Sequence, residues 1–197
     1  MTIRPATDAD RDAIARICLL TGNAGGDATG MYGDETALAD VYATPYLDGP
    51  GSFALVWDQG EGAIGYCVGT SDTAAFQAWF TRTWWPSVAH AHPLRTEADE
   101  TLLRAATNAE RMMTPLVEDY PAHLHIDLLP QAQGKGAGRQ LIEAAVAILA
   151  DRGVPGVHLG IDPANVGAAA FYPRVGFQVA PGSPGDAFVR AISPAEA

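Results

Sequence analysis

Hydrophobic and polar positions recur with two different periods along the first 70 residues of the chain. Apolar residues at every second position are typical of strands, and apolar residues three and four positions apart are typical of helices. Thr7 is followed by acidic residues and then by an apolar stripe of Ile14, Ile17 and Cys18, which predicts a capped helix. The elements expected here are a strand at 3–6, that helix, a glycine-rich loop at 22–33, a second helical stretch at 34–47, and an antiparallel hairpin of 53–57 and 63–70.

The pattern changes between residues 73 and 121, which we interpret as a helical insert. Two helices are expected, separated by a kink at 86–93. The apolar side of the second is formed by Leu102, Leu103, Ala106, Met113, Leu116 and Val117. The insert, which holds Trp79, Trp84 and Trp85, is expected to form one wall of the acceptor site, with an interface between two copies of the chain as the alternative.

The last third of the chain alternates strands with helices. We expect a strand at 123–129, a helix ending at Gly153, a strand at 157–161, a helix through Tyr172 with Asp162 and Pro163 as its cap and first turn, and a closing hairpin of 177–180 and 187–192. This order predicts a mixed α/β (α+β) sheet, and no linker divides the chain into two domains.

Composition and charge exclude several classes of function. Hydrophobic residues make up 48% of the 197 positions, enough for one buried core. The net charge of −11 argues against a nucleic-acid or anionic-membrane binder, because a polyanion would be repelled over most of the surface. No apolar run reaches the ~18 residues of a membrane span, and no leader is recognised, so a cytoplasmic protein is expected. Cys18 and Cys67 lie in apolar segments and are expected to be buried free thiols.

A glycine-rich turn, Gln133-Gly134-Lys135-Gly136-Ala137-Gly138-Arg139, joins the strand at 123–129 to the next helix. Glycines let the backbone approach an anion, and a helix start offers unpaired N–H groups and the positive end of a dipole. The dinucleotide motif would need a third glycine at Arg139 or Leu141, and the triphosphate loop would need Gly-Lys-Ser or Gly-Lys-Thr. The turn therefore indicates a phosphate site of another kind, with a purely structural turn as the alternative.

Two segments carry a resemblance to a known family. The Gln-x-x-Gly-x-Gly spacing after Leu128-Leu129-Pro130 resembles the pyrophosphate loop of the GCN5-related N-acetyltransferases (the GNAT superfamily). Residues 165–177, Asn-Val-Gly-Ala-Ala-Ala-Phe-Tyr-Pro-Arg-Val-Gly-Phe, resemble the superfamily's Asn-x-x-Ala-x-x-Phe-Tyr-x-x-x-Gly-Phe segment. More narrowly, residues 21–27 and 120–128 resemble bacterial acetyltransferases related to the C-terminal acetyltransferase-like domain of eukaryotic O-GlcNAcase, whose eukaryotic relatives are regarded as catalytically silent.

The resemblance implies one GNAT domain over residues 1–197, with the insert at about 73–121 between the third and fourth strands. It implies acetyl-CoA as co-substrate and a small-molecule or peptide amine as acceptor. A CoA-binding or protein-interaction module without turnover is the alternative, and a homodimer is compatible with either. The residues expected to bind CoA are Ile126, Asp127, Leu128, Gln133, Gly134, Lys135, Gly136, Ala137, Gly138, Arg139, Asn165 and Tyr172. Among these, the charges of Lys135 and Arg139 are alternatively only solvated, and Asn165 is alternatively a helix cap.

The same resemblance assigns catalytic roles. Tyr172 occupies the position of the proton donor, with a hydroxyl bonded to backbone as the alternative. Pro173 removes a helical hydrogen bond, so the helix is expected to turn or end there. The segment that borders the acceptor contains Asn23, Asp27, Tyr42 and Tyr46.

The base is sought among His123, His125 and Asp127, which alternate along one strand and therefore share a face. His125 with Asp127 can relay the proton of the amine, because histidine ionises near neutral pH. A hydrogen-bonded strand face is the alternative. No metal site is expected, since strand neighbours lie ~6–7 Å apart and no fourth ligand is evident.

Overall fold

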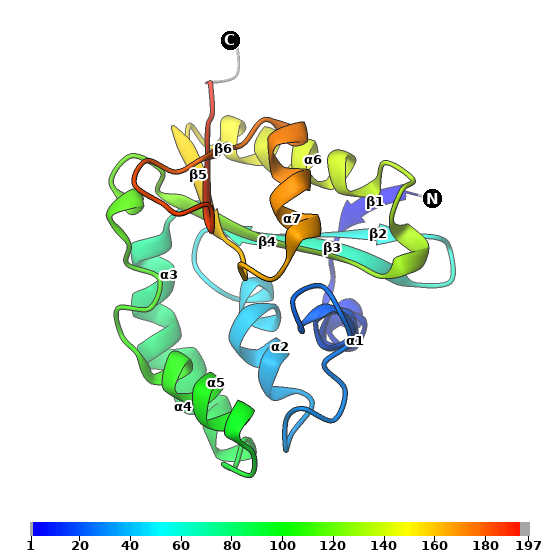
Figure 1. Ribbon diagram of the computed structural model, residues 1–197, viewed down its shortest axis with the longest axis vertical. Coiled ribbons are helices and arrows are strands. Elements are labelled where there is room, and N and C mark those ends of the chain that lie inside the picture. Colours follow the sequence, from blue (N-terminus) through cyan, green and yellow to red (C-terminus); the bar gives the residue numbers. More distant parts are fainter. Residues whose placement is uncertain (1, 194–197) are drawn as a thin grey trace.

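The computed structural model describes residues 2–193, which form a seven-stranded mixed sheet with helices on both faces (Figure 1). The strands are β1 (Thr2–Pro5), β2 (Ser52–Asp58), β3 (Ala63–Thr70), β4 (Ala122–Leu128), β5 (Gly156–Gly160), β6 (Gln178–Val179) and β7 (Ala187–Ala191), in the sheet order β1-β2-β3-β4-β5-β7-β6. The mixed α/β fold and both hairpins are confirmed, because β2 with β3 and β6 with β7 pair antiparallel.

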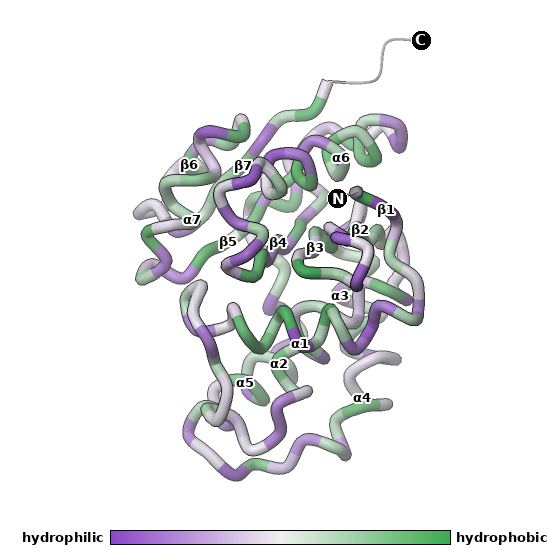
Figure 2. The backbone as a smooth tube through the Cα atoms, turned by 90° about the vertical axis from the view of Figure 1, so that its right-hand side faces the viewer, coloured by the Kyte–Doolittle hydropathy of each residue, from purple (hydrophilic) through white to green (hydrophobic). Residues whose placement is uncertain are grey.

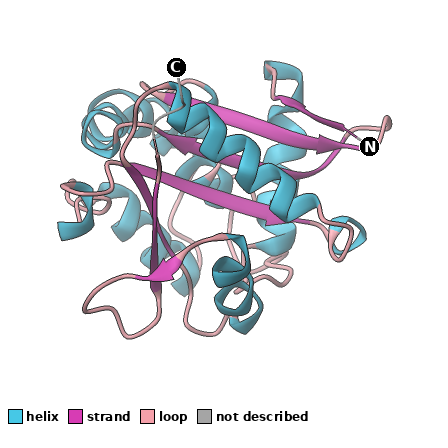
Figure 3. Cartoon of the chain, turned by 90° about the horizontal axis from the view of Figure 1, so that it is seen from above, coloured by secondary structure: helices cyan, strands magenta, loops and turns pink. Residues whose placement is uncertain are grey.

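Two hydrophobic layers separate the sheet from its helices. The helices α1 (Arg11–Thr21) and α2 (Ala37–Tyr42) lie on one face, and α6 (Ala137–Asp151) and α7 (Val166–Phe171) lie on the other (Figure 1). Successive side chains of β2 and β3 enter opposite layers, as the period of two predicts. Figure 2 shows hydrophobic stretches along the strands and along α1 and α6, and Figure 3 shows the long helix α6 crossing over the sheet.

The helical insert between β3 and β4 is confirmed, but its helices differ from those expected. The chain stays helical through Pro86, in the order α3 (Thr73–Trp79), a π-helical turn (Phe80–Trp84) and α4 (Trp85–Val88). A 3-10 turn (Ala89–Ala91) follows, and the break comes at 92–96, before α5 (Glu97–Thr107).

The second helix of the insert is shorter than predicted. It ends at Thr107 because Asn108 has extended backbone angles and its side chain accepts a hydrogen bond from the backbone N–H of Glu110. Met113, Leu116 and Val117 therefore lie beyond the helix, and the prediction that they continue its apolar side is wrong.

The start of α7 also differs from the prediction. Asp162 forms a turn, since its carboxylate accepts from the N–H of Ala164 and its carbonyl from that of Asn165. The cap is Asn165, whose side-chain oxygen accepts from the N–H of Ala168 at 2.9 Å. The other end is as predicted: α7 stops at Phe171, and a 3-10 turn with Pro173 near its start follows.

The sheet divides where β5 leaves β4. These two strands pair in parallel only at Ala122 with Val157 and at His123 with His158, and the rest of β5 pairs with β7 alone. From Leu124 to Leu128, β4 is therefore paired with β3 on one side and has a free edge on the other. Among the described residues, no helix is long and apolar enough to cross a bilayer.

Candidate active site

Two adjoining cavities lie along the free edge of β4. The first, of about 680 Å³, lies between the end of β4, the glycine turn and α7. The second, of about 610 Å³, lies between β4, the α1–α2 segment and α5. The residues that line both are Thr21, Ala24, Gly25, Ile126, Asp127, Asn165, Ala168 and Tyr172. A molecule in one cavity can therefore meet a molecule in the other beside Tyr172 and Asp127.

The glycine turn presents backbone to the first cavity. Gly136 is the N-cap of α6 and has a φ of +79°, a left-handed conformation that glycine adopts without strain. A Cβ on Gly138 would lie 3.0 Å from the ring of Phe171, so glycine permits α6 and α7 to approach each other. The first N–H groups of α6 have no partner within the helix, and the residues that carry them, Ala137, Gly138 and Arg139, line the first cavity, which suits an anion.

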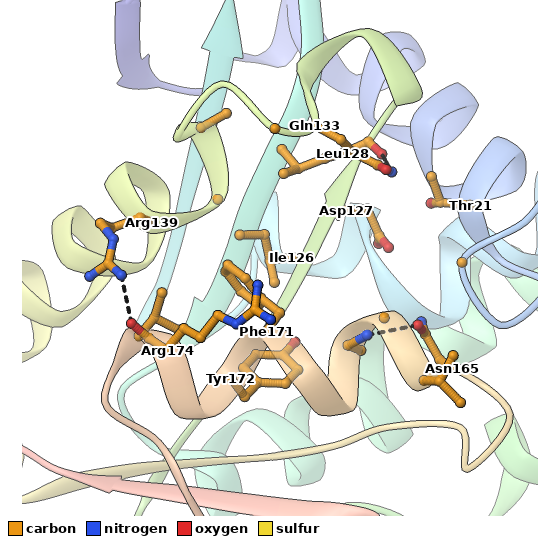
Figure 4. Close-up of a pocket in the computed structure, with 18 of the residues that line it drawn as sticks. Thr21, Ile126, Asp127, Leu128, Gln133, Arg139, Asn165, Phe171, Tyr172 and Arg174 are labelled. Atoms are coloured by element: carbon orange, nitrogen blue, oxygen red, sulfur yellow. Dashed lines mark hydrogen bonds between the residues drawn. The ribbon is translucent and has the colours of Figure 1, made fainter.

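All of the predicted CoA-binding residues except Lys135 line the first cavity. Lys135 is exposed and does not line it. Arg139 lines it and donates to the carbonyl of Arg174 at 2.7 Å (Figure 4). Arg174, which with Lys135 and Arg139 is one of the cations that the sequence places near the glycine turn or in the last helix, adds a second cation to the lining.

Tyr172 lies between the two cavities. Its side chain comes from the end of α7, and Figure 4 shows the hydroxyl directed toward β4. No residue among 2–193 forms a hydrogen bond with that hydroxyl, so the alternative of a backbone-bonded tyrosine is not realised in the described part of the chain. Burial raises the pKa of Tyr172, with the charge of Asp127 as a further cause, and the hydroxyl stays protonated.

The three polar residues of β4 share one face, as predicted, but only two reach a cavity. His125 and Asp127 line the second cavity, whereas His123 is buried behind them. Asp127 accepts a hydrogen bond from the hydroxyl of Tyr66, and burial raises its pKa. Burial and then the charge of Arg111 lower the pKa of His125 to about 4, so its ring is uncharged at neutral pH. No cluster of three metal-ligating side chains occurs among residues 2–193.

The tryptophans of the insert do not line either cavity. Trp84 donates to the backbone carbonyl of Asp40 at 2.8 Å, Trp79 packs against Trp84, and Trp85 stacks on Phe80. Trp84 thus attaches the insert to α2. The insert does form one wall of the second cavity, as predicted, but through Ala98, Thr101, Leu102 and Ala105 of α5 rather than through its tryptophans. The alternative of an interface between two copies stays a prediction.

Of the four residues expected beside an acceptor, only Tyr42 lines the second cavity. Tyr46 is buried below it, and its hydroxyl lies between His123 and His125. Asn23 and Asp27 belong to the α1–α2 loop, which reaches the cavity through Ala24 and Gly25.

Comparison with known proteins decides the family. Residues 27–177 match the model of the Acetyltransferase (GNAT) family. The chain belongs to this family. The GNAT chain is 40% identical to SsHAT in its crystal structure, with a TM-score of 0.85 over 96% of this chain and 97% of that one.

More distant GNAT structures share the fold. A phosphinothricin acetyltransferase from Sinorhizobium meliloti, in complex with AcCoA, has a TM-score of 0.56 and 18% identity over 98% of this chain and 88% of that one. The ribosomal-protein-S18-alanine N-acetyltransferase from Escherichia coli has a TM-score of 0.53 and 18% identity over 99% and 96%. The present chain is thus a GNAT acetyltransferase, which uses acetyl-CoA as its acetyl donor.

Proposed function

We propose that this GNAT acetyltransferase transfers the acetyl group to an amine by direct attack of the amine nitrogen on the thioester. The observation that carries the proposal is the junction of the two cavities at Tyr172 and Asp127. Donor and acceptor held on the two sides of that junction would meet beside a protonated tyrosine. Holding two reactants in contact removes much of the entropic barrier of a bimolecular step.

The first cavity has the features needed for CoA. The backbone N–H groups of Gly134 to Arg139 would bind the pyrophosphate, with Arg139 and Arg174 as charge partners in an otherwise acidic chain. The free edge of β4 from Ile126 to Leu128 would pair with the pantetheine arm and the thioester carbonyl, as an added strand pairs with a sheet edge. The contributions of Lys135 and of the side chain of Asn165 stay predictions.

The second cavity suits an amine carried on an apolar body. Its lining is mostly apolar and aromatic, with Asp127 and Asp162 as its carboxylates and no lysine or arginine among its described residues. A carboxylate favours a nearby ammonium and disfavours an acidic group. We therefore infer that the acceptor is an apolar or aromatic amine rather than an acidic peptide.

Each proton in the reaction has a place among these residues. The acceptor ammonium gives one proton to His125 or Asp127, and its nitrogen attacks the carbonyl carbon. The C–N bond forms, the C–S bond breaks, and Tyr172 donates its proton to the departing thiolate. The second proton of the nitrogen restores Tyr172 through solvent, which leaves an amide, a free thiol and one released proton.

The finer assignment to the acetyltransferases related to the O-GlcNAcase C-terminal domain belongs to this proposal as well. It is supported by the segments 21–27 and 120–128, which supply Thr21, Gly25, His125, Ile126 and Asp127 to the cavities. A cytoplasmic location and a homodimer likewise stay predictions.

Thermal stabilisation by acetyl-CoA and release of free thiol across a panel of apolar, polar and acidic amines test the proposal. Gly136→Glu should abolish the stabilisation, because it places bulk and negative charge at the pyrophosphate site. Tyr172→Phe should keep the stabilisation and lower kcat by about 100-fold, within the range for loss of a general acid. Tyr120→Phe, remote from both cavities, is the matched control. Stabilisation without thiol release for any amine would refute transfer, and full activity of Tyr172→Phe would refute the acid.

A further inference from the structure

We propose that Thr73, His123 and Tyr46 are positioning residues, which form a hydrogen-bond chain that fixes the tautomer of His125 so that its Nδ1 faces the acceptor cavity without a proton. The proposal rests on the proposed function, because it makes His125 rather than Asp127 the group that takes the proton of the amine. It also makes a residue at the start of the insert responsible for the chemistry of a cavity that it does not line.

The hydrogen-bond chain begins at the backbone carbonyl of Pro121 and ends at His125, which lines the second cavity. The hydroxyl of Thr73 lies 2.7 Å from the carbonyl oxygen of Pro121 and 2.8 Å from Nδ1 of His123. Nε2 of His123 lies 2.6 Å from the hydroxyl of Tyr46, and the same hydroxyl lies 3.2 Å from Nε2 of His125. The links therefore run Pro121–Thr73–His123–Tyr46–His125.

The direction of every link follows from the first one. A carbonyl oxygen only accepts, so the single hydroxyl proton of Thr73 is used on Pro121, and Thr73 must accept from His123. His123 then carries its proton on Nδ1 and accepts on Nε2, so the hydroxyl of Tyr46 donates to it. The oxygen of Tyr46 is left to accept from Nε2–H of His125. An uncharged His125 consequently has its lone pair on Nδ1.

Burial keeps the hydrogen-bond chain in this single arrangement of donors and acceptors. Thr73 is 0%, Tyr46 1% and His123 6% exposed, so water does not compete for these hydrogen bonds. Burial lowers the pKa of His123 well below its ordinary value, which keeps its ring uncharged and the direction of the chain fixed. The neighbouring His158 lies outside the chain, because its Nδ1 pairs with the carbonyl of Tyr120.

Nδ1 of His125 is the end of the chain that can act on a ligand. It has no hydrogen-bond partner among the described residues, and the His125 ring lines the second cavity. The edges of the Tyr42 and Tyr46 rings lie against His125, with centroids 6.0 and 5.5 Å away, and hold its plane. A base with a fixed plane and a fixed tautomer accepts a proton without first rearranging.

Loss of the hydrogen bond between Thr73 and His123 should reverse the donor and acceptor roles of all the later hydrogen bonds. In Thr73→Val, Nδ1–H of His123 has no acceptor, so the favoured tautomer of His123 becomes the one that donates from Nε2 to Tyr46. Tyr46 then donates to Nε2 of His125, and the proton of His125 moves to Nδ1. The ring stays in place, but the lone pair that faced the cavity is gone.

The experiment compares two buried threonines three positions apart. Thr73→Val should lower kcat by at least about tenfold, since a histidine base in the wrong tautomer fails in catalysis. The KM for acetyl-CoA and the thermal stabilisation by acetyl-CoA should not change. Thr70→Val is the matched control: Thr70 is also 0% exposed and pairs with His123 in the sheet register, but its hydroxyl binds the carbonyls of Pro50 and Asp72. Thr73→Ser, which keeps the hydroxyl, should restore kcat.

The ¹⁵N resonances of labelled histidine rings read the tautomer without any activity assay. Nδ1 of His125 should resonate as an unprotonated nitrogen in the wild type, in Thr70→Val and in Thr73→Ser, and as a protonated one in Thr73→Val. A protonated Nδ1 in the wild type would overturn the proposal even if Thr73→Val did not fold. An unchanged kcat with a reversed tautomer would also overturn it. If the tautomers behave as expected but no amine is acetylated, the proposed function fails and the hydrogen-bond chain stands.

Discussion

Arg111 is the charged residue with the largest effect on the pKa of His125, the proposed base. Its guanidinium carbon lies 5.2 Å from the ring centroid of Tyr42 and 5.0 Å from that of Phe80, a cation between two aromatic faces. Its Nε and Nη2 are buried without a hydrogen-bond partner among the described residues. The charge of Arg111 disfavours a second positive charge on His125, and is the main cause after burial of the low pKa of that ring.

Arg111→Met should therefore raise the pKa of His125 from about 4 toward its ordinary 6.5, without reaching it because burial remains. In an active enzyme the acidic limb of kcat/KM should move to higher pH in the same direction, since His125 must be uncharged to take a proton. An NMR titration of the His125 ring measures the shift. Arg104→Met, which removes an exposed cation paired with Glu100 on α5, is the control. An unchanged His125 pKa in Arg111→Met would contradict this account.

At the scale of residues, the sequence predicts positions whose role depends on local spacing. The glycines of the turn, Tyr172 and the shared face of His125 and Asp127 follow from motif and period, and all reach a cavity. Tyr46 lies 79 positions before His125 and Arg111 lies 14 positions before it, so both meet His125 only because the chain folds. The contacts of Arg111 and Tyr46 with His125 depend on how the helices pack on the sheet, and no periodic pattern or motif in the sequence predicts them.

Helix α7 is the element on which the position of Tyr172 depends, and its start is held by one side chain. The cap at Asn165 satisfies an N–H group of a helix only six residues long. Asn165→Ala should lower the free energy of unfolding by about 1 kcal/mol. The Tm should fall by ~2–4 °C for a chain of this size.

The control for this prediction is Asn165→Asp, which keeps an accepting oxygen and should retain most of the Tm. Measuring Tm without acetyl-CoA separates a cap from a ligand contact. If Asn165 served only to bind CoA, the two variants would have the wild-type Tm in the absence of ligand, and the capping account would be refuted.

Elements with a strong period were predictable, and those defined by a competing turn were not. The strands, α1 and α6 follow the apolar pattern. The extents of α5 and α7 were wrong because Asn108 and Asp162 bind nearby backbone N–H groups with their side chains, which offers the chain a turn in place of a helix. The π-helical turn before Pro86 likewise carries the helix past a residue that the sequence treats as a breaker.

For the whole molecule, the buried uncharged histidines predict how stability changes with pH. Burial lowers the pKa of His123, His125 and His158, whereas in the unfolded chain each titrates near 6.5. Below about pH 6.5 the unfolded state therefore binds more protons, and the free energy of unfolding decreases as the pH falls. Asp127, whose pKa is raised, acts in the opposite direction but is a single group.

The Tm should consequently fall between pH 7.5 and 5.5, a range that lies above the ordinary pKa of the carboxyl groups. Differential scanning calorimetry measures it. His158→Gln should reduce the slope, and the exposed His90→Gln should leave it unchanged. A Tm that is constant or rises on acidification would show that relief of the net charge of −11 outweighs the histidines.

The family and the fold could be predicted from the sequence because the glycine turn and residues 165–177 resemble motifs of the family, and both segments line the first cavity. The acceptor side could not, because its walls come from α2, α5 and the α1–α2 loop, which are brought together only in three dimensions. The tryptophans illustrate the difference. The insert that holds them lines the second cavity through α5, whereas Trp84 binds α2 and Trp79 packs against Trp84.

The division of the sheet at His123 has a consequence for cooperativity. The strands β1 to β4 and the strands β5 to β7 share only two pairs of residues, so backbone hydrogen bonding couples the two halves weakly. Acetyl-CoA bound in the first cavity would contact both β4 and α7, and would therefore link the two halves of the sheet. The ligand-bound molecule should then unfold as a more nearly single unit than the free one. His123 pairs with His158 at the junction of the two halves, and it also belongs to the proposed hydrogen-bond chain that orients His125. A change that separates β4 from β5 should therefore also disturb the orientation of His125.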